Sequence, residues 1–359
     1  MARELSRREA LTLTGLATAG ACLPAGSARA AAKPPAAPVA LGRCRTYGPE
    51  MATALDSLLD KLGGLRGMVS GKTVAVKVNL TGGPLPALGG RSVGQTYHVH
   101  PNVVLACCQA LARASARRIR LLEGWDPAVS AEQFLGECGW NLGALRALPA
   151  RVEFENTNNR GSGKRYSRLK VPFGGYIFPS YEFNHSYEDC DFFVSLAKMK
   201  NHYAAGVTLA LKNCFGAAPA SFYGDDAGSE SAKVSRGAIF HSGKARPPAP
   251  AAQEIDPSTP REPGYRVPRI TVDLAAAIHP IGLSIIDGIE SVQGGEGPWV
   301  GQLRLVEPGL LVVGANPVAT DAVATALMGY DPAGERTSPP FYRGDNTMKL
   351  AEAAGLGSA

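Results

Sequence analysis

The sequence predicts an α/β fold, with a mostly parallel sheet and helices on both faces, built as one large unit or as two lobes around a cleft. Strand-like apolar runs alternate with helical segments, and such alternation is typical of parallel sheets with right-handed crossovers. Residues 192–196 are nearly all apolar and β-favouring, as in a strand that is covered on both faces. Polar residues follow several of these runs, at the sheet edge where open α/β folds bind ligands.

The first 30 residues resemble a twin-arginine signal peptide. Residues 6–11 read SRREAL, and a weakly hydrophobic stretch follows as far as Leu23, too short to span a bilayer permanently. Residues 28–30 (ARA) then supply a small-x-small cleavage pattern. The resemblance implies that the twin-arginine machinery exports the folded chain to the periplasm or outside the cell, often with a cofactor already bound. Lipid attachment at Cys22 is the alternative, although the usual leucine of that motif is missing.

Helices and strands are expected in alternation along the rest of the chain. Pro101 and the Asn-Pro pair at 316–317 mark helix starts, because proline suits the first helical turn and asparagine caps a helix. Short apolar runs mark the strands. In order, the expected elements are a helix at 51–65, a strand at 73–79, a Gly- and Pro-rich loop at 81–96, a helix at 101–117, a strand at 118–124, a strand from about Phe192, strands at 282–288 and 309–316, and a helix at 317–328.

These elements divide the chain into four parts. Residues 1–30 form the signal peptide, 31–72 a helical lead-in, 73–332 the α/β domain and 333–359 a tail. Residues 217–267 are rich in Ala, Gly, Ser and Pro, and a loop of this length inside a compact domain is usually an insertion or a lid.

The charge and hydropathy patterns argue against nucleic-acid and membrane partners. Without the signal peptide, which holds four Arg and two Glu, 33 basic and 29 acidic residues leave a net charge of +4. No basic run interleaved with aromatic residues occurs, so we expect no nucleic-acid partner. No other segment approaches about 18 uninterrupted apolar residues, so we do not expect the mature protein to be embedded in a membrane.

The six cysteines outside the signal peptide show no metal or iron–sulfur spacing. None forms a Cys-x-x-Cys pair, and no four are spaced as zinc or cluster ligands. Cys107 and Cys108 lie in an apolar helical run and are expected to pack in the core. Cys214 is expected to fill core space, with a ligand or a reactive thiol as the alternative.

Polar residues gather at or just beyond the carboxyl ends of the predicted strands. Four lysines accompany only two carboxylates there, and such a net positive cleft suits phosphate or carboxylate groups. Neighbouring lysines also lower one another's pKa, which favours a lysine nucleophile or base. The sequence does not specify a metal ligand. We predict catalytic roles for His202, Lys212 and Glu123 and ligand contacts for Lys77, Asn79, Lys198, Lys200, Asn213, Asp287 and His241.

Three further features are less decisive. Two of them have two interpretations each, and the third is a single expectation. His98 and His100 would share one side of a strand, as metal ligands can, or His100 caps the helix that follows. Asp321 lies one turn into its predicted helix, where a carboxylate is equally structural or functional. The glycine-rich loop around Trp299 is expected to cover the cleft.

The order of these motifs resembles that of the domain of unknown function 362 family. In that family a strand leads into Lys-x-Lys-x-His and later into Leu-Lys-Asn-x-Phe-Gly, which are residues 198–202 and 211–216 here. The resemblance extends over about 74–332 and implies little about activity, since the family is named for an unknown function. Some members carry a ferredoxin module with four-iron four-sulfur motifs, and this chain lacks that cysteine pattern. The other landmarks are 76–79 (VKVN), 123–124 (EG), 287–288 (DG) and 316–324 (NPVATDAVA).

A partial resemblance links the chain to the lactate racemase family. That family has a histidine, a small-residue run with Ala-Gly, and a lysine ten residues after the histidine, and here His202, 205–206 and Lys212 follow the same order. In the racemases the lysine anchors a nickel-pincer nucleotide cofactor and the histidine is a base. The resemblance thus implies a covalent or nucleotide-type cofactor at Lys212. The second racemase histidine has no counterpart, because Trp125 and Asp126 stand at the comparable place.

Two function classes follow from these features. The first is an exported enzyme or cofactor-carrying protein that acts on a small anionic molecule at the Lys/His cleft, with Glu123 or His241 as the proton partner of His202. The second is a non-catalytic periplasmic binding protein for an anionic ligand or a metal complex. A covalent adduct at Lys212, a chromophore or a stoichiometric metal in protein from the native host would favour the first class.

Overall fold

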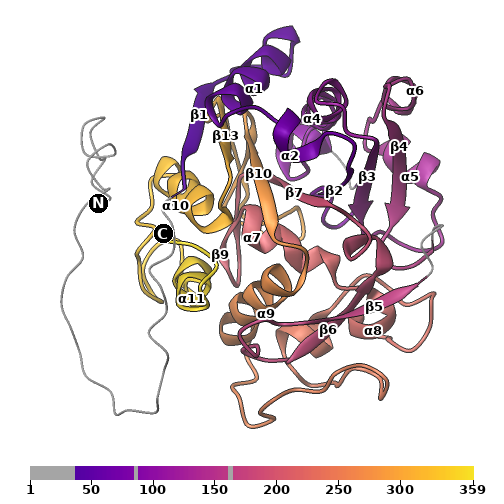
Figure 1. The fold of residues 1–359 in the computed structure, drawn as a ribbon. Coiled ribbons are helices and arrows are strands. Elements are labelled where there is room, and N and C mark those ends of the chain that lie inside the picture. Colours follow the sequence, from indigo (N-terminus) through magenta and orange to yellow (C-terminus); the bar gives the residue numbers. More distant parts are fainter. Residues whose placement is uncertain (1–36, 85–87, 161–164) are drawn as a thin grey trace.

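A seven-stranded sheet forms the centre of the molecule (Figure 1). The computed structural model describes residues 37–84, 88–160 and 165–359. The predicted signal peptide, its cleavage pattern and Cys22 lie outside these residues. In spatial order the strands are β1 (Val39–Arg43), β13 (Leu310–Gly314), β10 (Ile281–Gly288), β7 (Phe192–Lys198), β2 (Thr73–Lys77), β3 (Arg118–Glu123) and β4 (Arg151–Asn156).

Five neighbouring strands, from β10 to β4, run parallel, which confirms the predicted α/β class. β13 runs antiparallel to both β10 and β1. The chain adds β3 and β4 on one side of β2 and then β7 and β10 on the other, so the strand order reverses between β2 and β7. Open α/β sheets bind ligands at the carboxyl ends of strands beside such a reversal. Lys77 and Lys198 end these two strands.

Helices cover both faces of the sheet, as the sequence predicts. Side chains alternate between the two faces of a strand, and in β7 Val194 packs with α1 (Pro49–Lys61) and α4 (Pro101–Arg113). Its neighbour Phe193 packs in a second cluster with α9 (Pro263–Ala277). In Figure 1, α1 and α4 lie in the upper half of the view and α9 in the lower half.

The helix starts predicted at Pro101 and Pro317 are confirmed, whereas two helix ends were placed too late: α1, expected to extend to residue 65, ends at Lys61, and α4 also ends early. Asn316 caps α10 (Pro317–Leu327), because its side-chain oxygen accepts hydrogen bonds from two backbone N–H groups of the first turn, each at 3.0 Å. α4 ends at Arg113 instead of near residue 117. Ser115 has a φ of 66°, a left-handed conformation that cannot continue the helix.

The remaining elements are short, and all but α11, which follows the last strand, lie between the sheet strands in the chain. The segment 217–267, predicted as an insertion or a lid, buries Tyr223 and Phe240 in the second hydrophobic cluster. Gly206, at a φ of 76°, turns the chain between two strands of a hairpin that the sequence did not reveal. These elements are α2 (Arg66–Val69), α3 (Val93–Thr96), α5 (Ala131–Glu137), α6 (Leu142–Arg146), the hairpin β5 (Tyr166–Lys170) and β6 (Ser180–Asn184), the turn η2 (His185–Tyr187), the hairpin β8 (Lys200–His202) and β9 (Gly206–Thr208), α7 (Ala210–Asn213), the turn η3 (Cys214–Ala217), α8 (Ala220–Tyr223), the turn η4 (Gly237–His241), the hairpin β11 (Ser291–Gln293) and β12 (Arg304–Val306), and α11 (Thr347–Ala353).

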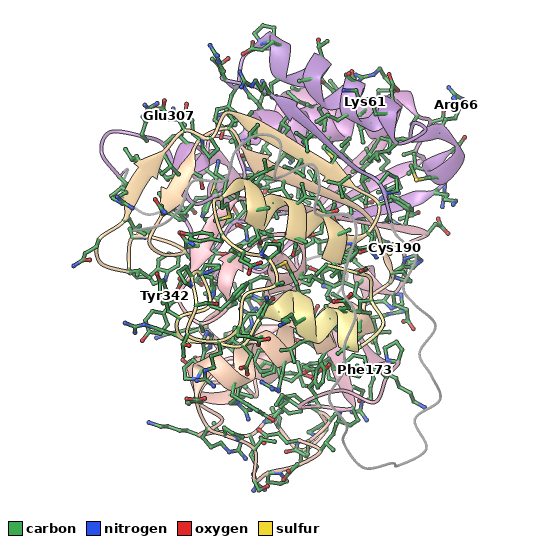
Figure 2. All side chains as sticks on the ribbon, turned by 90° about the vertical axis from the view of Figure 1, so that its left-hand side faces the viewer. Lys61, Arg66, Phe173, Cys190, Glu307 and Tyr342 are labelled. Carbon is green, nitrogen blue, oxygen red and sulfur yellow. The ribbon has the colours of Figure 1, made fainter. Side chains whose placement is uncertain are left out.

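Charged side chains occupy the outside of the molecule, as in most folded proteins. Figure 2 labels Lys61, Arg66 and Glu307 at its periphery, and all three are exposed. No helix in the described ranges has the length and apolar character that a membrane crossing requires. Lys77 and Lys198 are exceptions to the surface rule, since 1% and 0% of their surfaces are exposed.

Candidate functional site

Lys77 and Glu123, at the ends of β2 and β3, form a buried ion pair. Lys77 Nζ lies 2.8 Å from Glu123 Oε1 and donates a hydrogen bond to the carbonyl of Val78 at 2.6 Å. The second carboxylate oxygen of Glu123 accepts from the backbone N–H of Leu80 at 2.8 Å. Gly216 packs directly on this pair, where a Cβ atom would approach Lys77 Nζ to 3.1 Å. Each of the two charges is thus compensated by the other. The predicted ligand contact of Lys77 and catalytic role of Glu123 stay predictions.

Asn213 joins α7 to the reversal point of the sheet. Its amide nitrogen donates to the backbone carbonyl of Lys77 at 3.0 Å and to Ser195 Oγ at 3.1 Å. Its amide oxygen accepts from Asn79 Nδ2 at 3.2 Å and from Lys77 Nζ at 3.3 Å. In the described part of the chain, the buried Oδ1 of Asn79 has no hydrogen-bond partner. The side chains of Asn213 and Asn79 therefore form most of their hydrogen bonds within the protein, and their predicted ligand contacts stay predictions.

A second buried ion pair joins Lys198 of β7 to Asp287 of β10. The two residues are opposite each other in the parallel register, and Lys198 Nζ lies 3.0 Å from Asp287 Oδ2. Lys198 also donates to the Tyr47 hydroxyl at 2.9 Å and to the carbonyl of Gly94 at 2.7 Å. Asp287 accepts from the backbone N–H of His100 at 2.9 Å. Two of the four predicted lysines thus use both predicted carboxylates, and the other two lysines carry the excess charge.

Lys200 is fully buried without a carboxylate partner in the described residues. Its Nζ donates to the carbonyls of Tyr97 at 2.6 Å and Glu296 at 2.9 Å. Burial lowers the pKa of the Lys200 ammonium to about 7, and the nearby charge of Lys212 acts in the same direction. Only two of its three N–H donors have acceptors among the described residues.

Lys212, on α7, has the least compensated charge of the set. Its Nζ lies 4.0 Å from the centre of the Phe215 ring, a cation–π contact. It has no hydrogen bond or ion pair with any described residue, and its side chain is partly exposed. Burial lowers the pKa of the Lys212 ammonium to about 7, with Glu296 opposing and Arg236 adding to the shift.

His202 presents a hydrogen-bond donor. Its Nδ1 accepts from the backbone N–H groups of Ala204 at 3.1 Å and Ala205 at 3.3 Å. Because Nδ1 is an acceptor, the proton of the neutral ring is on Nε2. Burial lowers the pKa of His202 well below its usual value, and the charges of Lys212 and Lys200 lower it further. His202 is therefore neutral at physiological pH, with an N–H at its outer nitrogen.

His241 has the opposite tautomer. Its Nδ1 lies 3.2 Å from the carbonyl oxygen of Arg236, which can only accept, so Nδ1 carries the proton and Nε2 has a free lone pair. Its ring lies 5.5 Å from that of Phe215, which Lys212 also contacts. Burial lowers the pKa of His241, and so does the charge of Lys212. The segment 217–267 thus contributes a neutral proton acceptor.

We call Lys200, His202, Lys212 and His241 the Lys212 cluster. The charges of the other three all act on His202, so the four groups form one electrostatic unit. The cluster combines two lysines whose pKa is lowered to about 7 with one imidazole that donates a hydrogen bond and one that accepts. Such a set can hold an anion and move a proton.

The loop around Trp299 is fastened beside the cluster. The carboxylate of Glu296 accepts from the backbone N–H of Tyr203 at 2.9 Å and from Trp299 Nε1 at 3.3 Å. The Trp299 ring packs edge-on against Tyr97, with the ring centres 5.9 Å apart, and remains 47% exposed. The sequence analysis singled out the loop around Trp299 but not the carboxylate of Glu296 or the ring of Tyr97, because their contacts join residues far apart in the chain.

The metal-ligand interpretation of His98 and His100 is wrong for the described structure. His100 is the N-cap of α4 and accepts from the backbone N–H of Asn102 at 3.1 Å, as the capping alternative predicts. His98 bonds to the carbonyl of Thr81 at 3.1 Å and lies 3.8 Å from the sulfur of Cys138. No group of three or more His, Cys, Asp or Glu within the described ranges could hold a metal ion.

The second base of the racemase mechanism has no substitute at Trp125. This side chain is 4% exposed and stacks on Phe134, with ring centres 5.1 Å apart. Its indole N–H donates to the carbonyl of Val129 at 3.0 Å. Trp125 is a packing residue, so the racemase pair of histidines does not fit this chain. Cys214 is likewise a core residue, since 0% of it is exposed, and this burial raises the pKa of its thiol to about 12.

Two cavities of about 320 Å³ each lie away from the Lys212 cluster. Asn201, Tyr330 and Met328 line the first, and His100 and Cys138 line the second. Neither is lined by a member of the cluster. Lys200 is buried, whereas His202, Lys212 and His241 are partly exposed.

Comparisons with known proteins give a family and several distant relatives. A family model described as a domain of unknown function (DUF362) matches residues 74–326. Thylakoid-associated protein sll1697 of Synechocystis sp. is 29% identical over 303 residues, which cover 82% of this chain and 75% of that protein. A solved protein from Thermotoga maritima is 15% identical with a TM-score of 0.40, over 80% of this chain and 60% of that one. Lactate racemase apoprotein from Thermoanaerobacterium thermosaccharolyticum is 14% identical with a TM-score of 0.37, over 74% of this chain and 53% of that one.

Proposed function

The chain belongs to the domain of unknown function 362 family, and we propose that it is an exported protein that binds a small phosphate- or carboxylate-bearing ligand at the Lys212 cluster. The family description names no activity, so the proposal rests on the chemistry of these side chains. Their arrangement favours proton transfer on the bound ligand as the reaction class.

The ammonium of Lys212, which has no hydrogen bond or ion pair with any described residue, carries the proposal. A largely buried cation without a partner destabilises the fold, and a bound anion would remove that penalty. Lys200 adds a second ammonium with an unused N–H donor. The neighbouring pairs Lys77–Glu123 and Lys198–Asp287 are already neutral, so they support the site without competing for the ligand.

The two histidines would take different parts in a proton transfer. His202 offers an N–H from Nε2 and would donate a hydrogen bond to the anion. His241 offers a lone pair at Nε2 and would accept a proton from the ligand. This assignment reverses the expectation that His202 is the base.

Titration calorimetry with inorganic phosphate and with acetate tests the binding proposal. Lys212→Met keeps the chain length and removes the charge, so we expect about tenfold weaker binding or more, the size of one lost charge-assisted hydrogen bond. Lys61→Met, an exposed change on α1 (Figure 2), should bind as the wild type does. Wild-type affinity for acetate, whose charge does not change in this range, should fall between about pH 6 and pH 9, because the pKa of both Lys200 and Lys212 is about 7 and the neutral amines lose their attraction. Equal affinity of the Lys212 variant and the wild type at both pH values would contradict the proposal.

Protein from the native host separates an enzyme or cofactor carrier from a binding protein. The partly neutral amine of Lys212 is a nucleophile, which suits a covalent or nucleotide-type cofactor. Native mass spectrometry and a visible spectrum would then reveal an adduct at Lys212 or a chromophore. A bare polypeptide that binds anions reversibly without turnover would favour the binding-protein alternative.

We also propose export by the twin-arginine machinery to the periplasm or the cell exterior, with the machinery and the small anionic ligand as partners. The proposal is supported by the SRREAL segment at 6–11 and the cleavage pattern at 28–30.

A further inference from the structure

Asp321 is a buried carboxylate of α10 that accepts hydrogen bonds from the backbone of α7, a neighbouring helix. It lies in α10, whose amino terminus is already capped by Asn316. Its two oxygens accept from the backbone N–H groups of Ala210 at 2.8 Å and Leu211 at 2.9 Å. Only 2% of Asp321 is exposed, and no ion pair joins it to a described cation.

The helix that Asp321 contacts cannot cap itself. α7 has a single turn, and its N-cap residue is Leu209, whose side chain has no hydrogen-bonding atom. Buried N–H groups at a helix start destabilise the fold unless an acceptor satisfies them. Asp321 supplies both acceptors from outside the helix, a task that an Asp or Ser N-cap would perform locally.

α7 carries the central residue of the proposed site. Lys212 and Asn213 follow the two residues that Asp321 holds. Asn213 fixes the other end of the turn through bonds to the Lys77 carbonyl and Ser195 Oγ. With both ends of the turn fixed, the backbone of Lys212 is held where its ammonium contacts the Phe215 ring and its charge acts on His202.

We infer that Asp321 is a positioning residue for the Lys212 cluster, setting the place of Lys212 through the amino terminus of α7. The inference rests on the proposed function, because the role of Lys212 in binding an anion is itself proposed. The effect of Asp321 on the position of Lys212 can be tested separately. It resolves the two interpretations of Asp321 in the sequence, since the carboxylate serves a neighbouring helix that bears a site residue.

The test compares two buried carboxylates, Asp321 and Asp273, each of which accepts hydrogen bonds from two successive backbone N–H groups of another segment. Asp321→Asn removes one of the two acceptors at α7. Asp273→Asn is the matched control, because buried Asp273 of α9 accepts from the backbone N–H groups of Tyr176 at 2.6 Å and Ile177 at 2.9 Å, which belong to the segment between β5 and β6 and not to α7. Acetic anhydride labelling of each full-length variant, read at Lys212 by peptide mass spectrometry across pH, reports the environment of the amine. Calorimetry with inorganic phosphate reports binding.

We expect Asp321→Asn to shift the pH midpoint of Lys212 labelling and to weaken phosphate binding about tenfold, a loss that corresponds to about 1.4 kcal/mol. Asp273→Asn should lower the melting temperature without changing either readout. If Asp321→Asn does not fold, Asp321→Glu keeps the charge, displaces it by one methylene, and should show a smaller shift in the same direction.

Three outcomes separate the inference from the proposed function. An unchanged labelling midpoint in a folded Asp321 variant overturns the positioning role. An equal shift in the Asp273 control also overturns it, because the effect would then follow from general destabilisation. A shifted midpoint together with a wild type that binds no phosphate supports the positioning role and rejects the proposed anion site.

Discussion

Lys212 has a charge that forms no hydrogen bond or ion pair with any described residue, and this has a measurable effect on stability. The pKa of its ammonium is lowered to about 7 in the folded chain, whereas an unfolded lysine has a pKa of about 10.4. Between these values the unfolded state binds more protons, so folding becomes more favourable as the pH rises. The penalty is therefore complete below about pH 7 and disappears above about pH 10.

Replacing Lys212 by Met should consequently stabilise the fold at low pH. We expect a gain of about 1–2 kcal/mol near pH 6, which allows for screening because the side chain is partly exposed, and a gain close to zero near pH 10. Urea unfolding of the variant and the wild type at both pH values measures the difference. Lys61→Met should change stability little at either pH. A Lys212 variant that is less stable at pH 6 would show that the ammonium has a partner in solution.

At the scale of single residues, the sequence identified the charged groups but not their pairing. Lys77, Lys198 and Lys212 look alike in the sequence, because all three follow apolar runs. Strand register assigns Asp287 to Lys198, and Glu123 reaches Lys77 from the neighbouring strand. These partners are far apart in the chain, so local patterns contain no information about which lysine remains free.

At the scale of secondary-structure elements, the pair Lys198–Asp287 links β7 to β10 inside the sheet. Removing one partner of a buried pair leaves an uncompensated charge, so Lys198→Met should destabilise the fold by about 3–5 kcal/mol. The double variant Lys198→Met, Asp287→Asn should lose about 1–3 kcal/mol less than the sum of the two single losses. Denaturant unfolding of the four proteins in this cycle provides the measurement. Additive losses would mean that the two groups do not interact.

Elements with strong local signals were predicted best. α4 and α10 begin where proline and their capping residues place them, and β2, β3 and β10 lie at the strand segments predicted at 73–79, 118–124 and 282–288. The hairpin β8–β9 was missed, because its strands have three residues each and its turn depends on the left-handed conformation of Gly206. The antiparallel direction of β13 was not predictable either, because strand direction depends on which strands become neighbours.

At the scale of the whole molecule, the export proposal concerns the segment that precedes the fold. Because Arg7 and Arg8 form the twin-arginine pair, we expect Arg7→Lys together with Arg8→Lys to leave unprocessed protein in the cytoplasm. Cell fractionation and the mass of the product provide the measurement. Arg3→Lys changes a nearby arginine outside the pair and should be exported normally. Normal periplasmic accumulation of the double variant would reject this route.

β1 pairs with a strand that the ribosome synthesises much later, so the order of synthesis affects when this edge of the sheet forms. Its only sheet neighbour among the described strands is β13, with Val39 opposite Gly314. A ribosome makes the amino-terminal strand first, yet that strand has no partner until nearly all of the chain has been synthesised. A truncated product that ends before Leu310 leaves β1 as an unpaired edge next to the segment that bears the export motif. Completion of the sheet at β1 therefore distinguishes a chain that includes β13 from one that ends before it.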